Sequence, residues 1–460
     1  MRHGSVFLLR GPSKVVFVFL CVWAVVLVVW LNVSVRHLQA ASPPELPFGV
    51  FTLPGGGIYA QDFSYNMLYF KGIRDRLVQH PYRLEDQETI IRQLVPEARS
   101  GMSHAYSPVA FVLAYPLLKL PGAAAYFFYT CLCAVGILLL YFHLLLPRAK
   151  TRLQLAALTI CVGSTCVMHG YIMGQTTLLT TTLIGFFWAL LQSREVASTN
   201  GKDLLIALLF WGICLKPSLA PIPFMLMLGA RAWRPLLIGF GLLLLTWLML
   251  ADDYGGWWMG LQDYLNLVNH YDDAEMTPFM QRGHAFTDRE MVHLYLTQTE
   301  WFALDRNLEL MLSLTALGLR WFGRIDGPTH FEAAVWIFLL FSPYLLPTED
   351  WVICLLIVEG NFFATKGMWA WPKFIILFCM MNLRAGLTFP IDVEEPCKYV
   401  LGLWALAEWM AARARAESRW KERYPLPMPA EEAAAYRLKN FSAPTSDPSS
   451  DRIRDTRISC

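Results

Sequence analysis

The sequence has few charged residues for its length. Only 16% of its 460 residues are Asp, Glu, Lys or Arg, whereas soluble domains contain roughly 25%. Hydrophobic residues make up 55% of the chain and come in long runs. This composition excludes an ordinary soluble domain and indicates a polytopic membrane protein. The net charge of +2 says little as a sum, and we expect no nucleic-acid partner.

The sequence also lacks the patterns that mark metal, disulfide and nucleotide sites. Most of its ten cysteines lie inside apolar runs, where they act as small hydrophobes. No CxxC pair or His/Cys cluster of zinc spacing occurs, and Cys131 and Cys133 have the wrong spacing. No P-loop or Rossmann glycine pattern is present. We therefore expect no metal and no other cofactor.

The apolar runs predict about twelve membrane-spanning helices, because a helix needs about 20 residues to cross the hydrocarbon core. Several runs are shorter and must lean on neighbouring helices. The first run has no small-residue cleavage site after it, so we expect a retained span rather than a signal peptide. The predicted spans cover residues 15–31, 123–146, 153–169, 176–192, 203–215, 218–230, 236–250, 307–319, 331–343, 350–365, 374–384 and 397–411.

Lys and Arg cluster in every second loop between these spans, which predicts that those loops and both termini are cytosolic. The loops on the other side are nearly free of cation excess. Two long segments, residues 32–122 and 251–306, are then expected to face outward. The membrane domain is predicted to end at residue 411, and residues 412–460 form a cytosolic tail that begins as a helix and becomes disordered.

The first outward segment is predicted to contain loop helices. Tyr65 to Gln79 is amphipathic, Glu85 to Ala98 is polar and helix-like, and Pro108 to Leu118 is an apolar stretch too short to span, as in an interfacial helix. The second segment is acidic and rich in Trp and Tyr, which suits either a membrane-interface belt or stacking on sugar rings.

Asp62 is the candidate around which the first outward segment is organised. It lies among aromatic residues, just after the run Gly55 to Gly57. A carboxylate that is partly desolvated is a better proton acceptor at neutral pH, as a general base requires. The alternatives are a helix N-cap and a solvated loop acid.

Polar residues at membrane depth are costly and are functional candidates. Lys216 lies next to Pro217 between two apolar runs, where a phosphate is a natural counter-charge; the alternative is snorkelling to the interface. His169 and Gln175 lie where the third predicted span ends and the fourth begins. Both are candidates for substrate binding, and the alternative for Gln175 is a helix cap.

Further polar residues lie near the ends of later spans. Glu349 and Asp350 stand at the mouth of one span, either in a substrate site or as favourable charges at a helix N-terminus. Arg384 ends the eleventh predicted span. A base together with a phosphate-binding cation is what glycosyl transfer from a lipid phosphate requires, because the acceptor hydroxyl loses a proton and the leaving phosphate must be stabilised.

These residues make the chain resemble the membrane enzymes of glycosyltransferase family 87, in the GT-C superfamily, which include polyprenol-phosphate-mannose-dependent mannosyltransferases. The resemblance covers about residues 10–410, and its motifs occur in the family's order. They are Gln61-Asp62-Phe63-Ser64-Tyr65, Tyr106-Ser107-Pro108, Gly174-Gln175, Leu215-Lys216-Pro217, and Ser342-Pro343-Tyr344 followed by an acidic residue.

The resemblance implies a GT-C bundle in the cell membrane, with its active site on the periplasmic side. A polyprenyl-phosphate sugar would enter from the bilayer, and Asp62 would deprotonate a glycan or glycolipid acceptor in a metal-independent inverting reaction. Lys216 and Arg384 would bind the donor phosphate. Some mannosyltransferases of the family have His-rich sequence where Glu349 and Asp350 stand here, so the sugar is left open among mannose, other hexoses and a pentose.

Tyr106, in the second of these motifs, is also expected to bind substrate.

Two alternative functions would use the same outward cavity. A transporter or flippase for lipid-linked sugars would need a route to the cytosol, and no internal repeats are visible. A non-catalytic subunit in envelope assembly would use the acidic segment 251–306 as a docking surface.

Overall fold

The structure is a computed structural model. It describes residues 51–52, 58–59, 61–96, 104–149, 151–196, 198–269, 298–341, 350–358, 362–363, 369–382, 397 and 399–411. The chain divides into two compact units, Met1–Trp409 and Met410–Cys460. The predictions for the first span and for the disordered tail lie outside the described residues, and every site discussed below lies in the first unit.

The described secondary structure is helical apart from one pair of short strands, which confirms the all-α prediction. Strand β1 (Phe51–Thr52) pairs antiparallel with β2 (Ile58–Tyr59) directly before the first described helix. The α-helices are α2 (Gln61–Arg74), α3 (Leu84–Leu94), α4 (Pro108–Ala114), α5 (Gly122–Leu139), α6 (Arg152–Val162), α7 (Thr165–Met173), α8 (Thr177–Val196), α9 (Asn200–Ile213), α10 (Pro221–Gly229), α11 (Trp233–Met249), α12 (Trp257–Asn269), α14 (Gln298–Trp321), α15 (Gly327–Phe341), α16 (Leu355–Val358) and α17 (Ala370–Asn382).

Shorter 3₁₀ and π segments extend or connect these helices: η1 (Leu117–Lys119), η2 (Leu140–Leu145), η3 (Leu146–Arg148), η4 (Pro217–Leu219), η5 (Ala251–Tyr254) and η6 (Asp350–Cys354). Helix α5 continues through η2 and η3. Within the described residues, Ala124–Arg148 is the one helix long and apolar enough to cross a membrane. Shorter apolar helices accompany it, among them Trp233–Met249 and Gly327–Phe341. The bundle of about twelve spans therefore stays a prediction.

Two predicted spans are wrong in their extent. The span expected over 153–169 is divided into α6 and α7, because the chain turns at Gly163 and Ser164. The Ser164 hydroxyl accepts a hydrogen bond from the Val167 amide and so begins a new helix. The span expected over 350–365 starts as η6 and continues as the four-residue α16, which ends at Val358.

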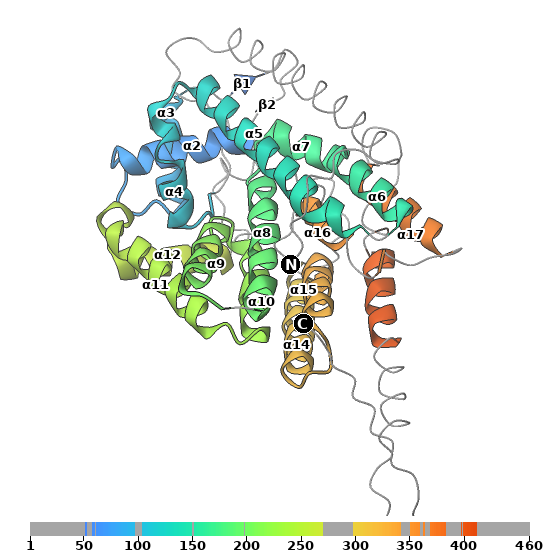
Figure 1. The fold of residues 1–460 in the computed structure, drawn as a ribbon. Coiled ribbons are helices and arrows are strands. Elements are labelled where there is room, and N and C mark those ends of the chain that lie inside the picture. Colours follow the sequence, from blue (N-terminus) through green and yellow to red (C-terminus); the bar gives the residue numbers. More distant parts are fainter. Residues whose placement is uncertain are drawn as a thin grey trace, which may run out of the picture. The chain divides into compact units, whose positions relative to one another are not determined.

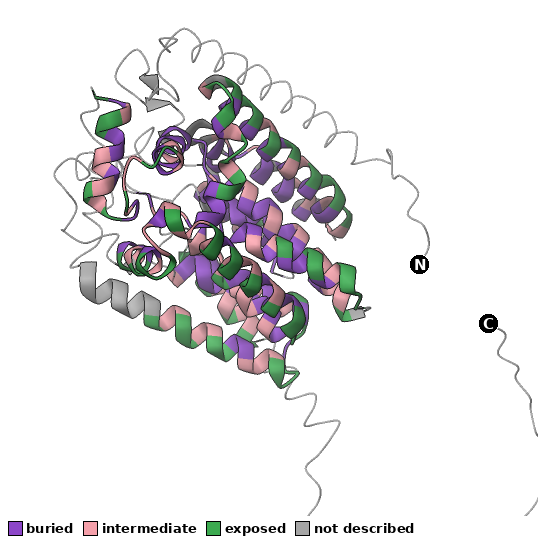
Figure 2. Cartoon of the chain, turned by 90° about the vertical axis from the view of Figure 1, so that its left-hand side faces the viewer, coloured by how far each residue is buried: buried purple, intermediate pink, exposed green. Residues whose placement is uncertain are grey.

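Helix α8 lies in the middle of the bundle, where it packs against α5, α7, α9 and α10 (Figure 1). Large apolar residues are exposed on the outer faces of the surrounding helices. Exposed residues are green in Figure 2. Soluble proteins rarely expose such contiguous apolar surface, whereas helices that face lipid do. These exposed residues include Phe127, Phe128 and Val135 of α5, Leu237, Leu244 and Leu245 of α11, and Leu310, Met311 and Leu314 of α14.

Helix α2 is buried on both sides, whereas the stretch Tyr65 to Gln79 was expected to be amphipathic. The helix already begins at Gln61 and ends at Arg74. One side, which includes Phe63 and Met67, belongs to the main core. The other side packs against α3. Asp62 is thereby placed in the first turn of a buried helix.

The two expected outward segments pack against each other. The ring of Tyr82 stacks on that of Tyr254, with centroids 5.1 Å apart and an interplanar angle of 22°, and Arg83 forms an ion pair with Asp263 at 3.1 Å. Tyr254 is buried, so it serves this packing rather than an interface belt or sugar stacking. Trp257, by contrast, is 47% exposed.

Candidate active site

Asp62 is buried rather than solvated. Its residue is 9% exposed in the first turn of α2, where the helix dipole favours a negative charge. The alternative of a solvated loop acid is therefore wrong. The short ladder of β1 and β2 leads the chain directly into this helix start.

Gly174 brings the Gly174-Gln175 motif against the start of α2. It adopts a φ of +71° in the Schellman motif that ends α7, in which the Gln175 amide donates to the Gly170 carbonyl over 2.8 Å. A Cβ at this position would come within 2.5 Å of the Phe63 Cβ. Only glycine therefore allows this approach.

The backbone of Gln175 is fixed by a hydrogen bond, and its side chain is buried. The Tyr129 hydroxyl donates to the Gln175 carbonyl over 2.7 Å. The side chain is 2% exposed, and its Oε1 has no hydrogen-bond partner among the described residues. Its backbone belongs to the end of α7, and its amide side chain is available as a polar group beside α8.

Lys216 points inward. It is 7% exposed, and its Nζ donates to the Thr177 hydroxyl over 2.6 Å. The snorkelling alternative is therefore wrong, since the ammonium lies at the first residue of α8 rather than at the surface. The turn that carries Lys216 is fixed by Ser107, whose hydroxyl donates to the Cys214 carbonyl over 2.6 Å.

The Tyr106 phenol experiences the charges of both Asp62 and Lys216. Its hydroxyl accepts a hydrogen bond from the Thr176 hydroxyl over 3.3 Å. Although part of the ring is exposed, burial of the hydroxyl raises the pKa of the Tyr106 phenol; the Lys216 ammonium lowers that pKa and the Asp62 carboxylate raises it. Asp62 and Lys216 therefore both lie within electrostatic range of one phenol.

The family model of glycosyltransferase family 87 matches residues 104–346, which is more than half of the chain. The chain belongs to glycosyltransferase family 87. No curated protein and no solved structure matches it. The matched stretch includes Tyr106, Gln175 and Lys216 but begins after Asp62. Phe63, the residue after Asp62, packs against Gly174 within the matched stretch.

Membership of family 87 indicates a glycosyltransferase rather than a transporter or an assembly subunit. A transferase needs a base for the acceptor and a positive charge for the leaving group. Asp62 and Lys216 are a buried carboxylate and a buried ammonium, and therefore candidates for these two roles. Among the described residues, no group of three His, Cys, Asp or Glu side chains could hold a metal ion.

The sequence reasoning missed a second polar network on α2. Asn66 lies one helical turn after Asp62, hydrogen-bonds to Tyr106 and contacts Nδ1 of His104 through its Oδ1 at 2.9 Å. Gln87 holds the backbone of His104 on both sides: its Nε2 donates to the carbonyl and its Oε1 accepts from the amide. The spacing of four residues after Asp62 was the one available signal for Asn66.

His104 is 1% exposed and its ring packs between aromatic side chains. Burial lowers the pKa of His104 to about 3, so the imidazole is neutral at physiological pH. In the neutral ring Nδ1 carries the proton and donates a hydrogen bond to the Asn66 Oδ1, so the contact adds no charge to the site. This network therefore orients Asn66, and through it the Tyr106 hydroxyl.

The other predicted site residues are not brought together by the described part of the structure. The backbone of His169 lies in α7, and that of Asp350 begins η6, which packs against α7 and α8. The side chains of these two residues, and Glu349 and Arg384 entirely, lie outside the described residues.

Proposed function

We propose that this family 87 member is a multi-pass membrane glycosyltransferase that moves a sugar from a polyprenyl-phosphate donor to an acceptor hydroxyl. The reaction takes place on the outer face of the cell membrane, and both termini are cytosolic. What supports this proposal is that Asp62 is buried in the first turn of α2 and that the buried Lys216 lies beside the first residue of α8, in the part of the chain that matches the family or directly before it. A hexose such as mannose is the sugar, and a glycan or glycolipid is the acceptor.

In the proposed reaction Asp62 takes the proton of the acceptor hydroxyl. The acceptor oxygen attacks the anomeric carbon of the donor and forms the new glycosidic bond, while the bond from that carbon to the phosphate oxygen breaks. The phosphate leaves with the electron pair of the broken bond. Because attack and departure occur on opposite faces, the anomeric configuration inverts.

Lys216 is proposed to stabilise the leaving phosphate together with the N-terminus of α8. The ammonium already lies beside Thr177, the first residue of this 20-residue helix. Backbone amides and the helix dipole at an N-terminus attract anions, and a buried lysine adds a full positive charge. Arg384 is proposed to contribute a second cation.

The remaining candidates are proposed to hold the sugar and the acceptor. Gln175 offers a buried amide oxygen beside α8, and Tyr106 offers a hydroxyl that accepts from Thr176 directly before α8. His169, Glu349 and Asp350 are proposed to complete the substrate site. No metal takes part in this mechanism.

The replacement of Asp62 by Asn tests the proposal. Membranes that contain Asp62→Asn should transfer no sugar from a polyprenyl-phosphate donor, because the amide cannot accept the proton, while expression and thermal stability in detergent stay unchanged. Glu85→Gln is the matched control, since Glu85 is an exposed carboxylate in the same outward segment. Full transfer activity in Asp62→Asn would refute the assignment of the base.

A further inference from the structure

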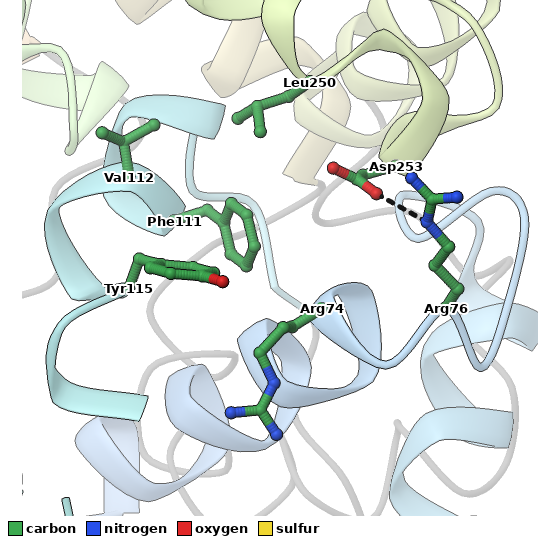
Figure 3. A pocket seen from close by; sticks show the side chains of 7 residues that line it. All are labelled: Arg74, Arg76, Phe111, Val112, Tyr115, Leu250 and Asp253. Atoms are coloured by element: carbon green, nitrogen blue, oxygen red, sulfur yellow. Dashed lines mark hydrogen bonds and ion pairs between the residues drawn. The ribbon is translucent and has the colours of Figure 1, made fainter. Parts of the chain in front are cut away.

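A second cavity lies at the other end of α2. It has a volume of about 390 Å³ and is lined by Arg74, Arg76, Phe111, Val112, Tyr115, Leu250 and Asp253 (Figure 3). Asp62 and Arg74 are twelve positions apart in α2, which at 1.5 Å per residue is about 18 Å along the helix. This cavity, which we call the Arg74–Arg76 pocket, is therefore distinct from the candidate active site.

Two arginines line the Arg74–Arg76 pocket, and each also forms an ion pair with one carboxylate, Arg74 with Asp75 and Arg76 with Asp253. Asp253 is the one carboxylate in that lining, and it accepts a hydrogen bond from Nε of Arg76 over 3.0 Å. Arg74 donates from Nε and Nη2 to the two carboxylate oxygens of Asp75 over 2.8 and 3.3 Å, and from Nη1 to the Leu118 carbonyl over 3.3 Å, which leaves one N–H on each Nη. A guanidinium has five N–H donors, so both arginines retain donors for an anion.

Arg76 adopts a backbone conformation that L-residues seldom take, with a φ of +51°. Its side chain is 65% exposed, and its guanidinium faces the cavity beside Asp253 (Figure 3). Such strain tends to persist where a side chain is held for function. The position would be easier for Gly or Asn, and Arg occupies it at the mouth of the cavity.

An exposed apolar surface adjoins the pocket. On α4, Val112 is 38% and Leu113 is 40% exposed, and at the end of α11, Leu248 is 49% and Met249 is 74% exposed. Helices α4 and α11 pack against each other. The pocket begins at Leu250, where the apolar helix α11 gives way to the acidic segment η5.

The volume of the cavity and the apolar surface beside it indicate which kind of ligand fits. A volume of about 390 Å³ is enough for a headgroup but not for a whole lipid. A soluble anion would leave the apolar surface of α4 and α11 exposed, whereas a lipid would cover it with its acyl chains. Basic pockets beside membrane helices bind phosphate headgroups in this way.

We infer that the Arg74–Arg76 pocket binds the phosphate headgroup of an anionic phospholipid, whose acyl chains lie along Leu113, Leu248 and Met249. The aromatic rings of Phe111 and Tyr115 form the wall against which the headgroup packs (Figure 3). This inference rests on the membrane placement in the proposed function, but not on the transfer reaction.

The test is lipid retention by the full chain purified in detergent. The protein is titrated with phosphatidylglycerol, phosphatidylcholine or inorganic phosphate, and retained lipid is measured by mass spectrometry alongside the melting temperature. We expect retention of phosphatidylglycerol and a rise in melting temperature with that lipid alone. The double variant Arg74→Gln/Arg76→Gln should weaken phosphatidylglycerol binding at least tenfold. Equal binding of phosphatidylcholine, or the same stabilisation by inorganic phosphate, overturns the inference.

Two further variants keep the test decisive if the double variant does not fold. Val112→Trp fills the pocket and leaves both ion pairs intact, so it should also lose phosphatidylglycerol; unchanged retention in this variant overturns the inference. Arg92→Gln is the matched control, because Arg92 is an exposed arginine that pairs with Glu88 away from the pocket. Asp62→Asn should retain the lipid while it loses transfer, so the two proposals fail separately.

Discussion

The Lys216 ammonium lies 2.6 Å from the Thr177 hydroxyl, which joins the turn after α9 to the first residue of α8. Lys216, which follows an apolar stretch and precedes a proline, is therefore a buried cation at the N-terminus of α8. Both the lysine and the helix end attract an anion at the same place. The contact with Thr177 supports the proposed role of Lys216 in phosphate binding, which the residues next to it in the sequence could not establish.

Replacement of Lys216 by Met should weaken donor binding. Hydrogen bonds to charged groups contribute about 1.5–3 kcal/mol, so the KM for the polyprenyl-phosphate sugar should rise by roughly 10- to 150-fold. Steady-state kinetics with varied donor measure this change. Lys202→Met is the control, because Lys202 lies partly exposed at the opposite end of α9. An unchanged donor KM would remove Lys216 from the phosphate site.

Gly174→Ala should reduce both stability and activity. The new Cβ would lie 2.5 Å from that of Phe63 in a backbone conformation with φ +71°, and a non-glycine residue there costs on the order of 1–3 kcal/mol. Relief of the clash would displace the start of α2 and with it Asp62, so kcat should fall. Thermal denaturation and a transfer assay measure the two effects.

The control for this substitution is Gly201→Ala. Gly201 lies in the first turn of α9, and a Cβ added to it would meet nothing within 4 Å. Alanine is a better helix former than glycine by up to about 1 kcal/mol, so this variant should be neutral or slightly more stable. Equal melting temperatures for the two alanine variants would contradict the close approach of Gly174 to Phe63.

Loss of the Ser107 hydroxyl should loosen the turn that carries Lys216. Ser107→Ala removes the 2.6 Å hydrogen bond to the Cys214 carbonyl, which costs about 1 kcal/mol in stability. Because the ammonium is then held less firmly, donor KM should rise more than kcat falls. Ser107→Thr retains a hydroxyl and should recover part of the donor affinity. A fall in kcat with no change in KM would argue against this positioning role.

His104 should make the folded protein sensitive to acid. Burial lowers its pKa to about 3, from the ordinary value of 6.5 that the exposed side chain has in the unfolded chain. The unfolded chain therefore binds a proton below pH 6.5 that the folded chain does not bind. Stability should fall as the pH decreases from 6.5 toward 3, by up to about 1.4 kcal/mol per pH unit.

His104→Gln tests this dependence. It keeps an amide partner for Asn66 but cannot take up the proton, so its melting temperature should decline less between pH 6.5 and pH 4 than that of the native chain. Tryptophan fluorescence during thermal unfolding provides the measurement. Parallel pH profiles for the two proteins would show that His104 is not the group responsible.

The candidate site was predicted from residues that break local rules. Lys216 and Gln175 interrupt apolar stretches, and Asp62 is an acid among aromatic residues. Asn66, His104 and Thr177 were missed because their roles come from contacts between α2, α8 and the loops that precede α4. No spacing in the sequence indicates such contacts, apart from the single helical turn between Asp62 and Asn66.

The helix pattern was predicted more reliably than its boundaries. Apolar runs predicted α5 and α8, because the burial of a helix depends on the side chains of that same segment. The break at Ser164 and the short α16 were missed, since capping and packing against neighbours decide where an apolar run stops being helical.

The sequence by itself determined an all-α chain with too little charge for a soluble protein, and it determined which polar residues are out of place in apolar surroundings. Both properties are local and can be read from neighbouring residues. Only the tertiary structure decided that Lys216 points inward to the start of α8 and that Asp62 is buried at a helix start. The physical reason is that the burial and electrostatic surroundings of a side chain are set by residues that are distant along the chain.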